Sequence, residues 1–239
     1  NASPHSYSMR VSDRSKIAEA ELVVWLGPEL EAFLAKVLDS DSKQVALGDL
    51  PGLIWPDSLH QQGEQHGHDH HGRDPHIWLS PSNGLVIVDA LRERLVALDP
   101  HNASQYESRA KAFQERLQIL DAELKESMRP VAHRGFFVFH DGFGHWVEHF
   151  DLNQLGAVSI GDRRPGAAHL YKLQKIAQDN AIVCLFGETS GRNPWARRMA
   201  KDIEAQYVEL DALAADESLD SYEELLRELA GNFSRCLAE

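Results

Sequence analysis

The densest group of possible metal ligands lies between residues 60 and 76, where HQQGEQHGHDHHGRDPH contains six of the chain's 13 histidines. Neutral imidazole is a good ligand for divalent transition metals such as zinc. Five of the six lie in a polar stretch without hydrophobic periodicity, residues 58–73, which predicts a mobile loop. This loop either binds metal loosely or is a solvated linker, and its histidines are His60, His66, His68, His70 and His71.

Three further side chains have positions that the surrounding sequence specifies. His76 follows a proline and precedes Trp78, where apolar packing can hold an imidazole ring in place. His140 ends the run FFVFH and Asp211 ends YVEL, so each stands where a parallel strand delivers a side chain to the ligand crevice of an α/β protein. Each also has an ordinary alternative, as a hydrogen-bonded histidine or a turn-capping carboxylate. His5, in NASPHSYS, lies in a polar turn that composition alone would not single out.

The composition excludes several classes of partner. A formal net charge of −13 and a pI near 5.4 favour cations and give nucleic acid or an anionic membrane surface nothing to attract. The 239 residues can bury enough apolar surface to fold without a metal or a disulfide. No apolar run approaches the roughly 18 to 20 residues of a membrane span, and no secretory signal opens the chain. We therefore expect a soluble protein that does not bind nucleic acid.

The two cysteines, Cys184 and Cys236, are far apart and have neither a CxxC nor a zinc-finger spacing. Taken alone, they are either a disulfide pair or two buried thiols, because their spacing does not distinguish these states.

The first part of the chain alternates helical and strand patterns. SDRSKIAEAE is helical, LVVWL is a buried strand, and EAFLAKVL again has helical spacing. Ser82 is a possible N-cap for an amphipathic helix that extends to Leu98. One apolar stripe then continues from Tyr106 to Met128, which predicts a single helix of roughly 25 residues and about 40 Å, ended by Pro130.

From Arg134 onward, short apolar strands alternate with helices, which favours a mostly parallel sheet. Asn193-Pro194 and the pair Ser221 and Glu224 are start signals for two of these helices. The predicted fold class is α/β, with two α/β lobes joined by one long rigid helix. The expected limits are 1–100 for the first lobe, 101–129 for the linking helix and 130–239 for the second lobe.

Taken together, several segments resemble the metal-binding solute-binding proteins of ABC importers that take up zinc and manganese, the family known as cluster A-I. They are SPHSYSMRVSD, AELVVWLGPELEAF, PHIWLSP, GFFVFHDGFGHW, RPGAAHL, IVCLFGE and VELDAL, together with the histidine-rich loop. These segments extend over nearly the whole chain. Any one of them alone would be a weak signal.

The resemblance implies a metal site in the cleft between the lobes, with ligands His5, His76, His140 and Asp211. Histidine at position 140 favours zinc, because manganese-type relatives often have glutamate there. A nitrogen-rich tetrahedral shell agrees with zinc chemistry. Two departures from the family pattern are Pro4, where some relatives have a glutamate ligand, and Ala212, where a proline usually follows the carboxylate.

The resemblance further implies high-affinity capture of Zn²⁺ in the periplasm and delivery to a cognate ABC permease in the inner membrane. It also implies a disulfide between Cys184 and Cys236, which an oxidising periplasm permits. We expect a monomer with a small hinge motion. The family's signal peptide and its first strand and helix have no counterpart here; we expect the signal peptide to have been removed, and the sequence does not explain why the strand and helix are absent.

Three alternatives stay open at this stage. A zinc-dependent hydrolase could use three histidines and a water, with Asp141, His145 or Glu148 as the base. No HExxH or GxSxG motif supports that alternative. A periplasmic zinc chaperone or buffer without a permease would use the same site, and a manganese-binding relative would differ only in the preferred ion.

Overall fold

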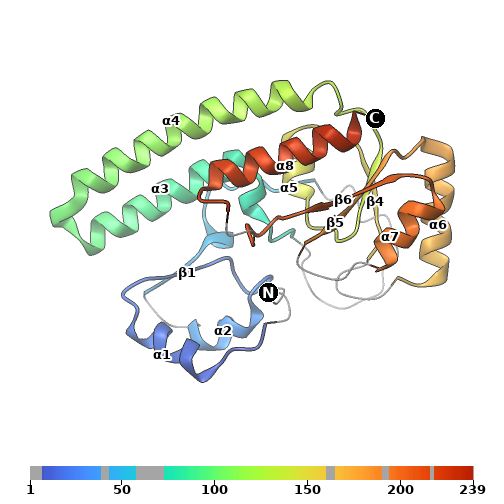
Figure 1. Cartoon of the computed structure of the whole chain (residues 1–239). Helices are drawn as coiled ribbons and strands as arrows, with labels where there is room; N and C mark the ends of the chain where they lie inside the picture. The colour runs from blue at the N-terminus through green and yellow to red at the C-terminus, as the bar shows by residue number, and fades with distance from the viewer. Residues whose placement is uncertain are drawn as a thin grey trace.

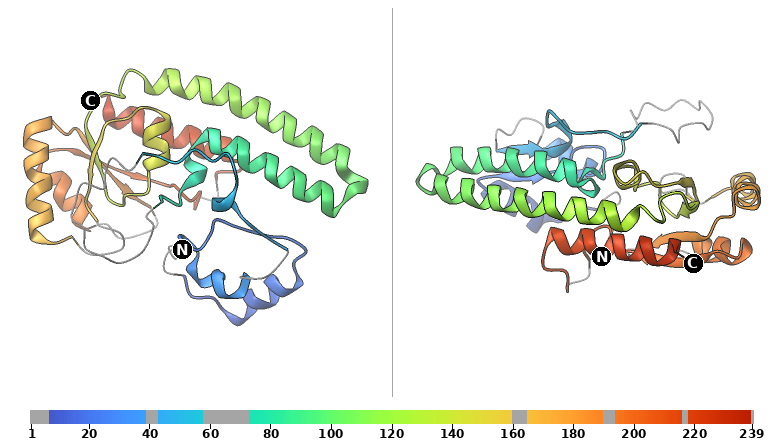
Figure 2. Two further views of the ribbon diagram at one scale, coloured as in Figure 1. Left: turned by 180° about the vertical axis from the view of Figure 1, so that it is seen from behind. Right: turned by 90° about the horizontal axis from the view of Figure 1, so that it is seen from above.

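The computed structural model describes residues 7–38, 43–57, 73–159, 165–189, 194–215 and 218–238. A small unit with a two-stranded sheet lies below the long helices α3 and α4 in Figure 1, and a larger unit with a four-stranded sheet lies to the right. We call the small unit, with α3, the first lobe, and the larger unit, with α5 to α8, the second lobe. The views in Figure 2 show the same arrangement from behind and from above.

The first lobe is built on two short parallel strands. Its elements are α1 (Val11–Glu19), β1 (Val23–Trp25), α2 (Ala32–Leu38), β2 (Gln44–Ala46) and the 3-10 turn η2 (Leu47–Asp49). Trp25, Leu34 and Leu38 form one small core between the sheet and α2. Val45 and Leu47 form a second core together with Ile77. The sequence patterns at residues 12–38 are therefore confirmed as helix, strand and helix.

Two long antiparallel helices follow the turn η3 (Ile77–Leu79). They are α3 (Pro81–Leu98) and α4 (Ala103–Met128), joined by η4 (Pro100–Asn102). The N-cap of α3 is Ser80, whose hydroxyl accepts from the backbone N–H of Asn83 at 3.4 Å. Ser82 is not the cap, because Pro81, with its fixed φ and missing N–H, suits the first helical position.

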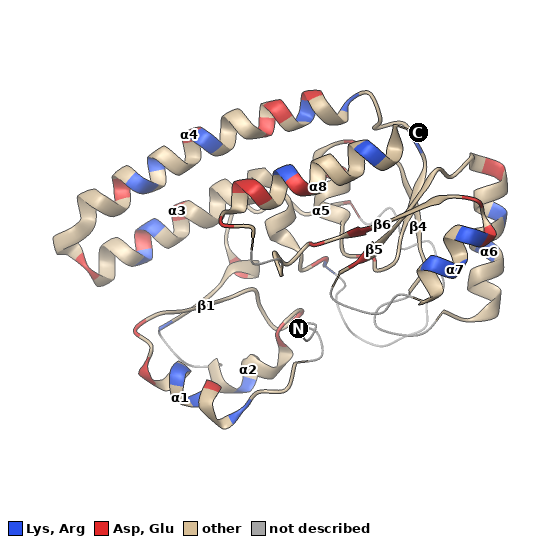
Figure 3. Ribbon diagram, viewed as in Figure 1, with Lys and Arg blue, Asp and Glu red and all other residues tan. Residues whose placement is uncertain are grey.

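The expectation of one long helix is confirmed, since α4 has 26 residues and ends before Pro130. It lies along both α3 and α8. Exposed ion pairs between Arg116 and Glu223 (3.0 Å) and between Arg227 and Glu123 (2.9 Å) connect it to α8. Pairs of this kind each contribute little, and Figure 3 shows the two signs of charge interspersed along these helices. None of the described helices is both long and apolar enough to cross a membrane.

The second lobe contains a four-stranded, wholly parallel sheet of order β4-β3-β5-β6. Its strands are β3 (Phe136–Val138), β4 (Gln154–Ala157), β5 (Cys184–Glu188) and β6 (Gln206–Leu210), and its helices are α5 (Gly144–His149), α6 (Ala167–Asn180), α7 (Pro194–Asp202) and α8 (Tyr222–Leu237). Phe136 and Val138 pack into the core formed with α4 and α8, whereas Phe137 packs into the core formed with α6 and α7. Helices thus cover both faces, which explains why FFVF is continuously apolar.

The α/β fold class with parallel sheets and a long helix is confirmed, while the limits at residues 100 and 130 stay a prediction. Ser221 caps α8, accepting from the backbone N–H of Glu224 at 3.2 Å. The Glu224 carboxylate accepts from the N–H of Asp220 (2.7 Å), one residue before the position expected for a capping box. Asn193 lies outside the described residues.

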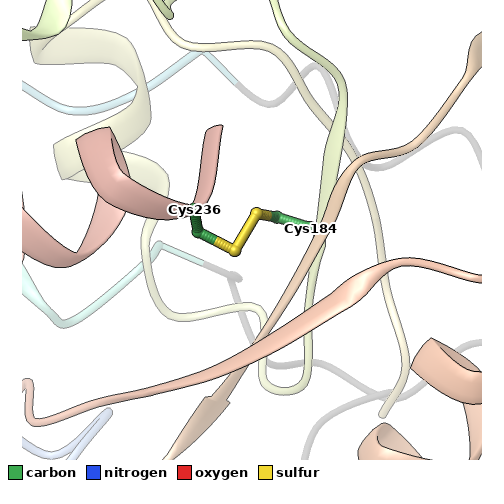
Figure 4. The surroundings of a disulfide bond; sticks show 2 residues. All are labelled: Cys184 and Cys236. Carbon is green, nitrogen blue, oxygen red and sulfur yellow. A yellow bond between two sulfur atoms is a disulfide. The ribbon is translucent and has the colours of Figure 1, made fainter. Parts of the chain in front are cut away.

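Cys184 and Cys236 form a disulfide, as the resemblance implied (Figure 4). The bond joins β5, at the centre of the sheet, to the last turn of α8, and the two Cα atoms are 6.0 Å apart. Both residues are almost completely buried. The disulfide therefore fastens the C-terminal helix to the sheet that it covers.

We predict that replacing both cysteines by alanine lowers the free energy of unfolding by about 2–4 kcal/mol, because the bond closes a long loop in the unfolded chain. The separation of 52 residues places the chain-entropy effect near the upper end of that range. Denaturant titration of the oxidised protein and the double variant measures the difference. Equal midpoints with equal slopes would contradict the prediction.

Candidate metal site

His76 and His140 lie against each other although 64 residues separate them in the sequence. Their ring centroids are 5.3 Å apart, and the rings are inclined by 73°. His76 precedes η3, and His140 follows the carboxyl end of β3 by two residues. A Cβ placed on Gly142 would lie 2.7 Å from the nearest carbon of each ring, so only glycine leaves room for both imidazoles. The structure thus brings together two of the predicted ligands.

The carboxylate of Asp74 is hydrogen-bonded to the His76 ring at Nδ1. One carboxylate oxygen, Oδ1, lies 2.6 Å from Nδ1 of His76 and also accepts from the His76 backbone N–H at 3.0 Å. Burial by itself raises the pKa of Asp74, but the hydrogen bonds from the ring and backbone of His76 counteract burial, and the pKa of Asp74 lies below its usual value. Because an ionised carboxylate only accepts, it favours the neutral His76 tautomer that has its proton on Nδ1 and its lone pair on Nε2.

His145, five residues after His140 and two after Phe143, is a buried imidazole. Its Nε2 donates to the carbonyl of Asp74 at 2.9 Å, and its Nδ1 accepts from Nδ2 of Asn83 at 3.2 Å. Burial, the largest effect, lowers the pKa of His145. Both ring nitrogens are therefore used in holding the chain around Asp74, and the neutral form is favoured.

Trp78 connects His76 to the segment that carries Asp211. Its ring centroid is 5.2 Å from that of His76, and its Nε1 donates to the carbonyl of Ala212 at 2.8 Å. Its own carbonyl accepts from the Tyr222 hydroxyl at 2.6 Å, and burial raises the pKa of that phenol. Asp211 is only 5% exposed, and its Oδ1 accepts from the backbone N–H of Leu213 at 3.2 Å.

Asp57 and Arg73, near the two ends of the histidine-rich stretch, both lie close to α5. The backbone N–H of Asp57 donates to Oε2 of Glu148 at 2.6 Å. The guanidinium of Arg73 lies 4.9 Å from the ring centroid of Trp55, which in turn is 5.5 Å from that of His145. Asp57 contacts α5 directly, and Arg73 is connected to it through Trp55.

His5 and the five loop histidines lie outside the described residues, so their placement stays a prediction. Within the described ranges, no three His, Cys, Asp or Glu side chains form a group that could hold a metal ion. Asp211 is buried near the histidine pair through Trp78 and Ala212, but it does not form such a group with His76 and His140.

Sequence reasoning missed Asp74 and Asn83, which support the site. Asp74 stands two residues before His76, a spacing at which a carboxylate can reach Nδ1 of the ring, so this signal was present in DPH. Asn83 gives no such signal. It is completely buried and exchanges hydrogen bonds with Ile54, 29 residues away (2.8 and 2.9 Å).

Two α/β lobes with parallel sheets, connected through a long helix, have the fold of the metal-binding solute-binding proteins. Residues 1–236 match the family described as zinc-uptake complex component A, periplasmic, or ZnuA, and the chain belongs to this family. Proteins of this family capture zinc outside the cytoplasm and deliver it to an ABC-type importer.

Curated relatives that match nearly the whole chain have the same family name. A high-affinity zinc uptake system protein ZnuA from Yersinia pestis is 33% identical, covering 99% of this chain and 81% of its own. A protein of the same name from Brucella suis is 30% identical, with coverage of 99% and 83%.

Solved structures of similarly named proteins have the same fold as this chain. A crystal structure of ZnuA superposes with a TM-score of 0.83 at 27% identity, covering 99% of this chain and 87% of the other. A zinc-bound ZnuA deletion mutant gives 0.81 at 28% identity, with coverage of 98% and 85%. The periplasmic zinc-binding protein TroA from Treponema pallidum gives 0.82 at 21% identity, covering 100% and 88%, and shows the likeness of fold alone.

We predict that Gly142→Ala weakens zinc binding on the order of tenfold or more, because the added methyl group pushes the two imidazole rings apart. Gly166→Ala is the matched control, since a Cβ there has nothing within 4 Å. Competition with a zinc chelator measures both affinities. Equal affinities in the two variants would show that the rings need not meet at Gly142.

Proposed function

We propose that this protein captures one zinc ion between its lobes and delivers it to an inner-membrane ABC permease. The proposed ligands are His5, His76, His140 and Asp211. The observation that carries the proposal is the contact between the rings of His76 and His140, which come from either side of the lobe junction. Imidazole nitrogens suit zinc, whereas manganese prefers more oxygen ligands.

In this proposal, Asp211 reaches the ion through a small movement of its segment, and His5 supplies the remaining ligand. Asp211 already lies next to Ala212, whose carbonyl is bonded to Trp78 beside His76, so only a short rearrangement is needed. Large closure is disfavoured because α4 packs along both α3 and α8. Small shear or loop ordering is then the expected response to zinc.

The hydrolase alternative is not favoured, because each of its candidate bases has another structural partner. His145 uses both ring nitrogens within the chain. Glu148 accepts from the backbone of Asp57, and Asp141 accepts from Nε2 of Gln154 at 2.8 Å. A general base must instead have its acceptor directed at the water it activates.

We predict that the protein binds zinc more tightly than manganese by on the order of 100-fold or more, since the shell is rich in nitrogen. His140→Ala should weaken the tight zinc site by a similar factor and remove the rise in melting temperature that zinc produces. Chelator competition and thermal unfolding of metal-stripped protein measure both effects.

The control for this variant is His133→Ala, which removes an exposed imidazole from the turn before β3. It should bind zinc as the unsubstituted protein does. Equal preference for the two metals, or a tight site unaffected by His140→Ala, would show that the ligands are assigned wrongly.

We also propose that the loop histidines are a low-affinity collector that raises the local zinc concentration beside the site. Deleting residues 60–71 should leave one tight zinc per chain and remove only weaker binding, because His76 and its supports lie outside the deleted segment. Calorimetric titration gives the number of sites in each class. Loss of the tight site on deletion would contradict the collector hypothesis.

A further inference from the structure

The carboxylate of Asp74 is surrounded by hydrogen-bond donors from two parts of the chain. Oδ1 faces the backbone N–H and the ring Nδ1 of His76, at 3.0 and 2.6 Å. Oδ2 accepts from the backbone N–H of Gly144 at 2.9 Å. The Asp74 side chain is 13% exposed and that of His76 is 9% exposed, so water has little access to replace these bonds.

This arrangement requires two acceptor oxygens. An asparagine has one acceptor and one NH₂ donor, so either orientation places its NH₂ group against an N–H of His76 or of Gly144. A buried donor that loses its acceptor keeps the cost of its desolvation. The hydrogen-bond donors around residue 74 therefore favour a carboxylate over an amide of the same shape.

Gly144 connects the same carboxylate to the segment of His140. It is the first residue of α5 and follows His140 by four residues. A Cβ at this position would lie 2.8 Å from Oδ2 of Asp74, so glycine permits the close approach. One side chain thus fixes the His76 ring and, through the start of α5, the turn that carries His140.

We infer that Asp74 is a positioning residue for zinc capture, which holds Nε2 of His76 directed at the ion and sets the distance between the His76 and His140 segments. The inference rests on the proposed function, because it takes His76 to be a ligand. A carboxylate behind a ligating histidine fixes the ring's tautomer and orientation and raises its basicity. Asp74 itself does not touch the ion.

The test uses the full-length chain in four forms: unsubstituted, Asp74→Asn, His76→Ala and the double variant. Zinc affinity is measured by chelator competition. We expect Asp74→Asn to weaken zinc binding about 10- to 100-fold. In the His76→Ala background, Asp74→Asn should cause a clearly smaller loss, because the part of its effect that passes through the ring is absent and only the effect on the His140 segment remains. Asp89→Asn is the matched control: it makes the same substitution at an exposed carboxylate on α3 that pairs with Arg92 at 2.9 Å and not with His76, and it should leave affinity nearly unchanged.

Nitrogen-15 NMR of the His76 ring gives a second test, and its main result comes from the unsubstituted protein. The unsubstituted, metal-free protein should show the proton on Nδ1, and Asp74→Asn should show a mixture of tautomers. A proton on Nε2 in the unsubstituted protein would overturn the inference even if Asp74→Asn did not fold. So would an Asp74→Asn affinity within threefold of the original when His76→Ala abolishes tight binding, or an equal loss in both backgrounds. If His76→Ala left tight binding intact, the proposed ligand set would fail first, and the inference with it.

Discussion

The position of His76, one of the proposed ligands, depends on η3, a turn of three residues whose side chains are divided between two hydrophobic cores. Ile77 packs with Val45 and Leu47 of the first lobe, whereas Leu79 packs in the large core of the second lobe. Both side chains are almost completely buried. Each contributes on the order of 1.5–3 kcal/mol through burial. Moving η3 relative to either lobe would expose one of them, so His76, which immediately precedes the turn, is held against both.

Apolar burial fixes the position of η3, and polar contacts then fix the orientation of the side chains around it. Trp78, between Ile77 and Leu79, directs its N–H to the Ala212 carbonyl, and Asp74 accepts from the start of α5. These groups are desolvated, so each bond is costly to lose. A histidine with its ring fixed before the ion arrives loses less conformational entropy on binding, which is how preorganisation increases affinity.

The sequence predicted the elements whose hydrophobic pattern follows from local geometry. FFVF is apolar throughout because helices cover both faces of β3, and the stripe from Tyr106 to Met128 matches α4. His76 and His140 were singled out because apolar packing and a strand end specify their positions, and only the family resemblance implied that they are ligands. Periodicity does not encode contacts between distant residues, such as Asp74 with Gly144 or Trp78 with Ala212. The N-cap of α3 was misplaced because Pro81 and Ser82 present competing start signals.

The anchoring of residues 57 and 73 near α5 has a consequence for how this chain can vary. Asp57 donates to Glu148 of α5, and Arg73 lies over Trp55, which is beside His145 of α5. Both flanking residues are therefore held near the same helix. The entropy of closing a loop rises only logarithmically with its length, by about 0.6 kcal/mol for each doubling. We therefore expect insertions and losses between these two points to cost little folding free energy. On that expectation, the number of histidines between residues 57 and 73 can change through mutation without moving His76.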